Sequence, residues 1–135
     1  MDSGSNFGEP ELTPDVWDIW RAVRDLAPPD SLVFVDQTRD MWSLIGGFNS
    51  YARTGQRQVY LADYILIFDL RNDPSKRRDV LNVNDSVLRG SARPSNLATR
   101  RYSSYFAVLP NFRPAPSSWS KVHQNNGYTL YQILP

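Results

Sequence analysis

Polar residues able to hold a ligand come directly after an apolar stretch, 32–35, that is predicted to be a β-strand. These residues are Asp36, Gln37, Arg39 and Asp40. In open α/β sheets, ligands bind beyond the carboxyl ends of the strands, where this segment would lie. Its carboxylates suit a cation or a sugar hydroxyl, and the Arg39 guanidinium suits a phosphate. The alternative is structural: Asp36 caps the following turn, and Arg39 pairs with a neighbouring carboxylate.

A further cation, Arg57, precedes the next predicted strand at 58–61. Its guanidinium is expected to reach an anion at the same sheet edge as Asp36, which would complete the candidate ligand site. The alternative is a surface arginine beside a turn glycine, Gly55.

Catalysis has little support in the sequence. The chain contains no cysteine, and His123 is its single histidine. Thiolate nucleophiles and cysteine zinc sites are therefore excluded, and a catalytic triad or a two-histidine metal site lacks its partners. We expect no catalytic residue, no metal site and no cofactor, and we expect His123 at an exposed position of a hairpin.

Length and charge limit the class of protein. The 135 residues suit one domain, and the net charge of +1 provides no field that would hold nucleic acid, so no nucleic-acid partner is expected. We predict a flexible lead-in over 1–12 and a single α/β domain over 13–135. No apolar run approaches the ~20 residues of a membrane span.

The elements that must position these residues follow from the apolar spacing. Thr13 and Pro14 predict the start of a helix over 14–26, and the prolines at 28 and 29 end it. Apolar runs predict strands at 32–35, 58–61 and 105–109. We also expect a helical segment over 41–48, an apolar stretch of ambiguous type over 64–70, a helix over 74–81, a loop over 82–94 and a short helix over 94–101.

The end of the chain predicts a C-terminal β-hairpin. Alternating segments at 121–124 and 128–133 flank Asn126 and Gly127, and Asn-Gly favours turns with positive φ angles. The predicted fold class is therefore α/β: a mixed sheet of about five strands with helices packed on it, closed by the hairpin.

Four sequence motifs resemble a known family in their order. A Trp-rich helix leads into Leu-Ala-Pro-Pro-Asp-Ser-Leu-Val at 26–33, followed by Gly-Gln-Arg-Gln-Val-Tyr-Leu at 55–61 and Ser-Tyr-Phe-Ala-Val at 104–108. The last motif consists of Trp119, Val122, Asn126 and Tyr131. This order, over 13–133, resembles the soluble C-terminal domain of bacterial polytopic membrane proteins of the GT-C glycosyltransferase type. The chain departs from that pattern at Gln56, which splits the Gly-Arg pair.

The resemblance implies an accessory domain at the extracytoplasmic face of a bacterial membrane, as part of a larger protein. It implies contacts with the membrane-embedded portion of that protein and with a glycan, a lipid-linked sugar or a partner. It carries over no catalytic residue. The alternative is a small free-standing enzyme, or a nucleotide- or phosphate-binding protein, that uses the sheet edge at 36–40.

Overall fold

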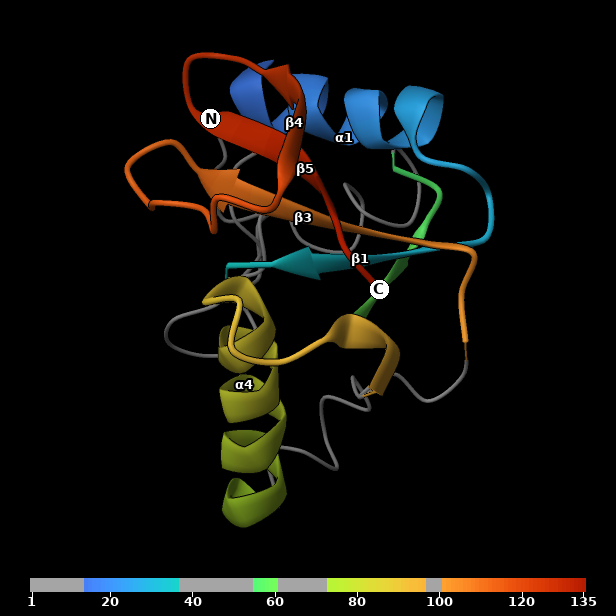
Figure 1. The fold of residues 1–135 in the computed structure, drawn as a ribbon. Coiled ribbons are helices and arrows are strands. Elements are labelled where there is room, and N and C mark those ends of the chain that lie inside the picture. Colours follow the sequence, from blue (N-terminus) through green and yellow to red (C-terminus); the bar gives the residue numbers. More distant parts are fainter. Residues whose placement is uncertain (1–13, 37–54, 61–72, 97–100) are drawn as a thin grey trace, which may run out of the picture.

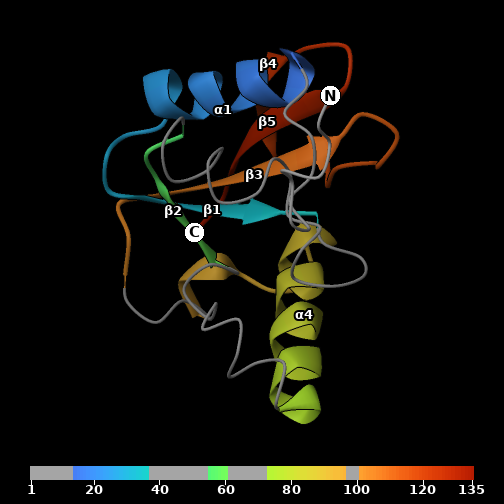
Figure 2. The same cartoon turned by 180° about the vertical axis from the view of Figure 1, so that it is seen from behind.

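The computed structural model describes residues 14–36, 55–60, 73–96 and 101–135, and they form a mixed five-stranded sheet with two helices packed on it (Figure 1, Figure 2). The strand order is β2-β1-β3-β5-β4. Strand β1 runs parallel to β2 and β3, whereas β5 runs antiparallel to β3 and β4. The predicted α/β fold with a C-terminal hairpin is confirmed. The strands are β1 (Ser31–Val35), β2 (Gln58–Val59), β3 (Ser104–Pro110), β4 (Ser120–Gln124) and β5 (Tyr128–Ile133).

Helix α1 (Pro14–Leu26) has the predicted bounds. It lies beside β5 and β4, at the top of Figure 1. One stripe of the helix enters the core because apolar residues recur every three or four positions, which places them on one face. The buried residues of this stripe are Val16, Ile19, Trp20, Ala22 and Val23.

Helix α4 (Pro74–Leu88) starts where predicted but is longer than the predicted helix over 74–81. Asp73 caps it by accepting a hydrogen bond from the Lys76 backbone nitrogen at 3.0 Å. The prediction of a loop over 82–94 was wrong for its first half, because Asn and Asp favour turns when they are judged locally. Tertiary contacts override that preference: Val80, Asn84, Val87 and Leu88 are buried.

Asn84 shows how the longer helix is held on the sheet. Strand β2 makes its last pair with β1 at Val33, so the Val35 carbonyl lies beyond the reach of that strand. The Asn84 side-chain amide donates to this carbonyl at 2.8 Å and is fully buried. A buried carbonyl without a donor is costly, so this bond favours helix over loop at Asn84.

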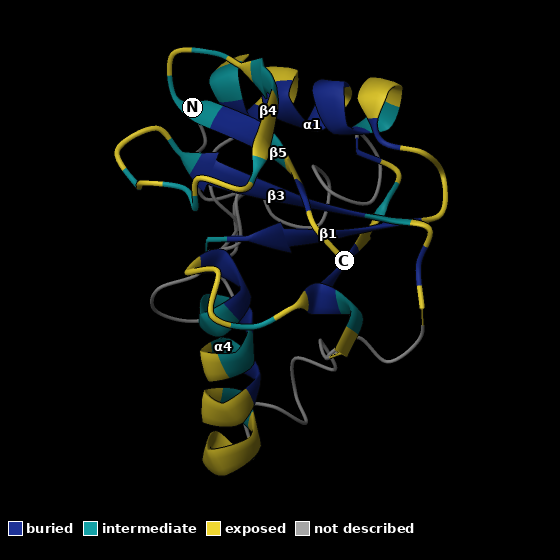
Figure 3. Cartoon of the chain, viewed as in Figure 1, coloured by how far each residue is buried: buried dark blue, intermediate teal, exposed yellow. Residues whose placement is uncertain are grey.

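The core fills both sides of the central strands. Every residue of β1 is buried, as are the five central residues of β3 (Figure 3). Such continuous burial is expected of parallel strands that are covered on two faces, as their sequences predicted. By contrast, the first turns of α4 are largely exposed and extend away from the sheet.

The hairpin turn is closed differently from the prediction. Within the described part of the chain, positive φ angles occur at Gln56 and Gly90, so neither Asn126 nor Gly127 adopts one. Instead, the Asn125 side-chain oxygen accepts from the backbone nitrogens of Gly127 and Tyr128, each at 2.9 Å. This Asx arrangement replaces the positive-φ turn.

Glycine at 127 is explained by close packing rather than by its conformational freedom. A Cβ atom added there would lie 3.1 Å from the Asp15 Oδ2 atom of α1. A side chain at this position would crowd Asp15, whose carboxylate would have to shift to make room.

The remaining predicted segments lie partly or wholly outside the residues that the structure describes. The short helix expected over 94–101 appears as the 3₁₀ helix η4 (Pro94–Asn96). The lead-in at 1–12, the helical segment at 41–48 and the apolar stretch at 64–70 lie outside the described residues. Within the described residues, no helix has the length and apolar character to cross a membrane.

Candidate functional site

The sheet edge beyond β1 holds an ion-pair cluster. The Asp36 side chain is 7% exposed, and its Oδ1 atom accepts from Arg113 Nη1 at 2.8 Å. Arg113 follows β3, the neighbour of β1, and its Nη2 atom also donates to Asp85 Oδ1 at 3.0 Å. Asp85 in turn pairs with Arg89 at 2.8 Å. Among the described residues, two arginines thus neutralise two aspartates in this cluster.

This cluster changes the interpretation of Asp36. Among the described residues its partner is Arg113, a residue of the loop after β3. The other predicted members of this site, Gln37, Arg39 and Asp40, lie outside the described residues. The strand order places β2 and β3 on opposite sides of β1, so this edge is a topological switch point, where ligands commonly bind in open α/β sheets.

Arg57 lies at the opposite end of the sheet, which corrects the expectation that it shares an edge with Asp36. Because Gln58 pairs with Leu32 in a parallel register, Arg57 lies level with the start of β1. At the usual rise per residue, about 16 Å separate that level from Asp36.

Arg57 closes the end of α1 instead of facing an anion. Its Nη2 atom donates to the carbonyls of Arg24 at 2.8 Å and Ala27 at 2.7 Å, and its Nε atom donates to Pro28 at 3.0 Å. Its Nη1 atom donates to the Gln56 carbonyl at 2.8 Å. The last carbonyls of a helix lack partners within the helix and carry partial negative charge, so a guanidinium is a suitable cap.

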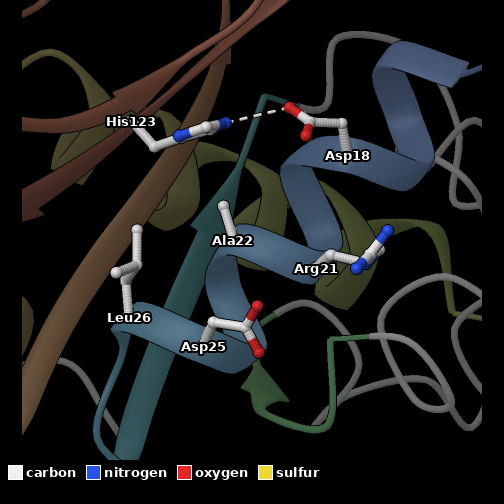
Figure 4. Close-up of a pocket in the computed structure, with 6 residues that line it drawn as sticks. All are labelled: Asp18, Arg21, Ala22, Asp25, Leu26 and His123. Carbon is white, nitrogen blue, oxygen red and sulfur yellow. Dashed lines mark hydrogen bonds and ion pairs between the residues drawn. The ribbon is translucent and has the colours of Figure 1, made fainter.

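A surface pocket of about 310 Å³ lies between α1 and β4 (Figure 4). Ala22 and Leu26 supply its apolar part, and four polar side chains surround them. The lining residues are Asp18, Arg21, Ala22, Asp25, Leu26 and His123.

The pocket is organised by a contact between His123 and Asp18, whose side chains point toward one another in Figure 4. The His123 Nε2 atom lies 2.9 Å from Asp18 Oδ2, and the Asn125 amide donates to the same oxygen at 2.9 Å. Hydrogen bonds from Asn125 and then His123 hold the pKa of Asp18 below its ordinary value of 3.8. Asp18 therefore remains charged at neutral pH and fixes the imidazole orientation.

The polar groups of the pocket offer both donors and acceptors. Arg21 presents guanidinium donors, and Asp25 presents a carboxylate whose Oδ1 atom is 3.0 Å from Arg24 Nε. With Nε2 directed at Asp18, the His123 Nδ1 atom is the remaining polar atom of the ring. None of the six lining residues carries a hydroxyl or thiol, so the polar groups of the pocket are two carboxylates, a guanidinium and an imidazole.

The sequence did not reveal this pocket. We expected His123 at an exposed hairpin position, but its side chain is only 35% exposed and is joined to α1. The two partners are 105 residues apart, and a register shift between Lys121 and His123 alters the pleat of β4. A β-bulge of this kind re-aims side chains, and nothing in the local pattern signals it.

Comparison with known proteins found no match: no protein-family model, no curated protein and no solved structure. The proposals below therefore rest on this chain's own residues.

Proposed function

We propose that this chain is a non-catalytic binding domain of a larger membrane protein, at the extracytoplasmic face of a bacterial membrane. In this proposal, the pocket between α1 and β4 contacts a glycan or the sugar of a lipid-linked sugar. The domain would also contact the membrane-embedded portion of the same protein. The membrane location is supported only by the order of the sequence motifs over 13–133. The observation that carries the sugar contact is the chemistry of the pocket wall.

A neutral sugar presents neighbouring hydroxyl groups, each of which is both a donor and an acceptor. The carboxylates of Asp18 and Asp25 accept hydrogen bonds, whereas the Arg21 guanidinium donates them. Leu26 is 49% exposed and offers apolar surface for the C–H face of a sugar ring. A few polar groups around an apolar surface are typical of small-molecule sites.

The charges of the pocket also favour a neutral ligand. Two aspartates and one arginine line the pocket, and one of the aspartates, Asp25, is already paired with Arg24. An anion would be repelled by both carboxylates, and a cation would be repelled by Arg21. The site as a whole therefore favours neither charge. At the other candidate site, Asp36 and Arg113 already neutralise each other, so these two described residues leave no net charge for a phosphate.

Isothermal titration calorimetry tests the proposal with neutral hexose and N-acetylhexosamine oligosaccharides. We expect saturable binding of at least one of these sugars to the wild-type chain. The double variant Arg21→Ala with Asp25→Asn should weaken it at least tenfold, because it removes one donor group and one charged acceptor. Its effect on folding should be small, since both side chains are exposed.

A matched control is available on α4. Arg78 and Asp79 are also exposed helical residues of the same two types, and they lie away from the pocket. The double variant Arg78→Ala with Asp79→Asn should retain wild-type affinity. Equal losses in the two double variants, or no sugar binding by the wild-type chain, would contradict the proposed function.

A further inference from the structure

The hairpin turn between β4 and β5 contains a chemically labile asparagine-glycine dipeptide. Asn126 and Gly127 are the one Asn-Gly pair in the sequence. Asn126 is exposed, and its side chain makes no hydrogen bond with the described residues. Glycine presents no side chain to hinder attack by its backbone nitrogen on the preceding side chain.

We propose that Asn126 is a site of spontaneous deamidation whose rate is set by the side chain of Asn125. This inference does not depend on the identity of the ligand in the neighbouring pocket.

The reaction is a hydrolysis in two steps. The Gly127 backbone nitrogen loses its proton and attacks the Asn126 Cγ atom, and the side-chain nitrogen leaves as ammonia. The new bond between nitrogen and Cγ closes a succinimide ring. Water then opens the ring at either carbonyl and gives aspartate or isoaspartate. One water is consumed and one ammonia released, with no change of oxidation state.

Asn125 restrains the first step. Its Oδ1 atom accepts from the Gly127 nitrogen at 2.9 Å, so that the attacking nitrogen is held as an N–H donor. Asn125 is itself fixed, because its Nδ2 atom donates to the Asp15 carbonyl and to Asp18 Oδ2, each at 2.9 Å. The turn is thereby fastened to α1, and the backbone rotation that ring closure requires is opposed.

The product would change the contact between the hairpin and α1. Deamidation adds a negative charge beside Gly127, where the backbone approaches Asp15 closely. Asp18 lies on the same side of the turn through its bond with Asn125. Repulsion from these two aspartates is expected to loosen the hairpin from α1.

The test is peptide mapping by mass spectrometry after the full chain is incubated at mildly alkaline pH. Asn126 is expected to be the first asparagine to gain the mass of deamidation and to yield isoaspartate. The variant Asn125→Ala should deamidate at Asn126 at least roughly fivefold faster, because fivefold is the factor that one hydrogen bond of average net strength represents and this side chain makes several. An unchanged rate in this variant, or earlier deamidation elsewhere, would overturn the proposal.

Asn111→Ala is the matched control. The Asn111 amide donates to the Asn125 carbonyl at 2.8 Å, so this variant loosens the same hairpin without freeing the Gly127 nitrogen. Its Asn126 rate should stay near that of the wild-type chain, whereas acceleration equal to that of Asn125→Ala would refute the role of the Asn125 oxygen. In strong denaturant all three chains should deamidate at one rate. A difference in rate that persists in denaturant would also refute the role of the Asn125 oxygen, because the folded turn would then not be the source of that difference.

Discussion

The imidazole of His123 and the carboxylate of Asp18 meet at 2.9 Å and join β4 to α1 across 105 residues of sequence. Asn125 binds the same carboxylate oxygen, so the hairpin holds the helix through two neighbouring side chains. This junction fixes the orientation of His123 at the proposed binding pocket. Stability and binding are therefore linked at Asp18.

Asp18 is expected to make the free energy of unfolding depend on pH in the acid range. Its pKa in the folded chain lies below the ordinary 3.8, mainly because Asn125 and His123 donate hydrogen bonds to it. A lowered pKa adds stability that is present above 3.8 and is lost as the pH falls below that value. Asp18→Asn should therefore flatten the fall of unfolding free energy in this range, measured by urea titration at several pH values. The exposed residue Asp79 provides the control, and an equal flattening in Asp79→Asn would contradict the role of Asp18.

Arg57 should contribute to stability through the end of α1. Arg57→Ala removes a cationic donor from the carbonyls of Arg24, Ala27 and Pro28, and we expect a loss of about 2 kcal/mol in unfolding free energy. Arg57→Lys keeps the charge but not the fork of donors, so it should recover only part of the loss. Denaturant unfolding of both variants measures this. Full recovery by lysine would show that charge alone matters.

Substitutions at Arg113 and Asp36 should have strongly non-additive effects on the free energy of unfolding. Arg113→Ala leaves the nearly buried Asp36 carboxylate without its cation, at a cost of about 3 kcal/mol. Adding Asp36→Asn should restore much of this stability, because the amide carries no charge that needs a partner. A double-mutant cycle by chemical denaturation measures the coupling. If the effects of the two substitutions simply add, the ion pair has no coupling energy and the prediction is wrong.

Much of the fold was predictable because its signals are local. Thr13 and Pro14 indicated where α1 starts, the prolines after it indicated where it ends, and the apolar stripe indicated its buried face. The continuous apolar runs of β1 and β3 predicted strands buried on both faces. The length of α4 was not predictable, since the bond between Asn84 and the Val35 carbonyl spans 49 residues. Local preference at Asn84 pointed to a loop, and only the folded chain reverses it.

The candidate sites were less predictable than the fold. Strand order was needed to show that Arg57 lies at the far end of the sheet from Asp36. The partner of Asp36, Arg113, lies in a proline-rich loop that gave no sign of a role. His123 was noticed as the single histidine, yet its contact with Asp18 depends on an irregular register in β4.

The most direct test of the proposed binding role uses His123 as a probe. Because the sequence contains one histidine, its imidazole signals in a nitrogen-15 NMR spectrum are unambiguous. Titration with the oligosaccharide that binds in calorimetry should shift these signals saturably, with the calorimetric affinity, while the amide signals of Arg78 and Asp79 on α4 stay in place. Sugar binding that leaves the His123 imidazole unmoved, or no sugar binding at all, would contradict the assignment of the pocket between α1 and β4.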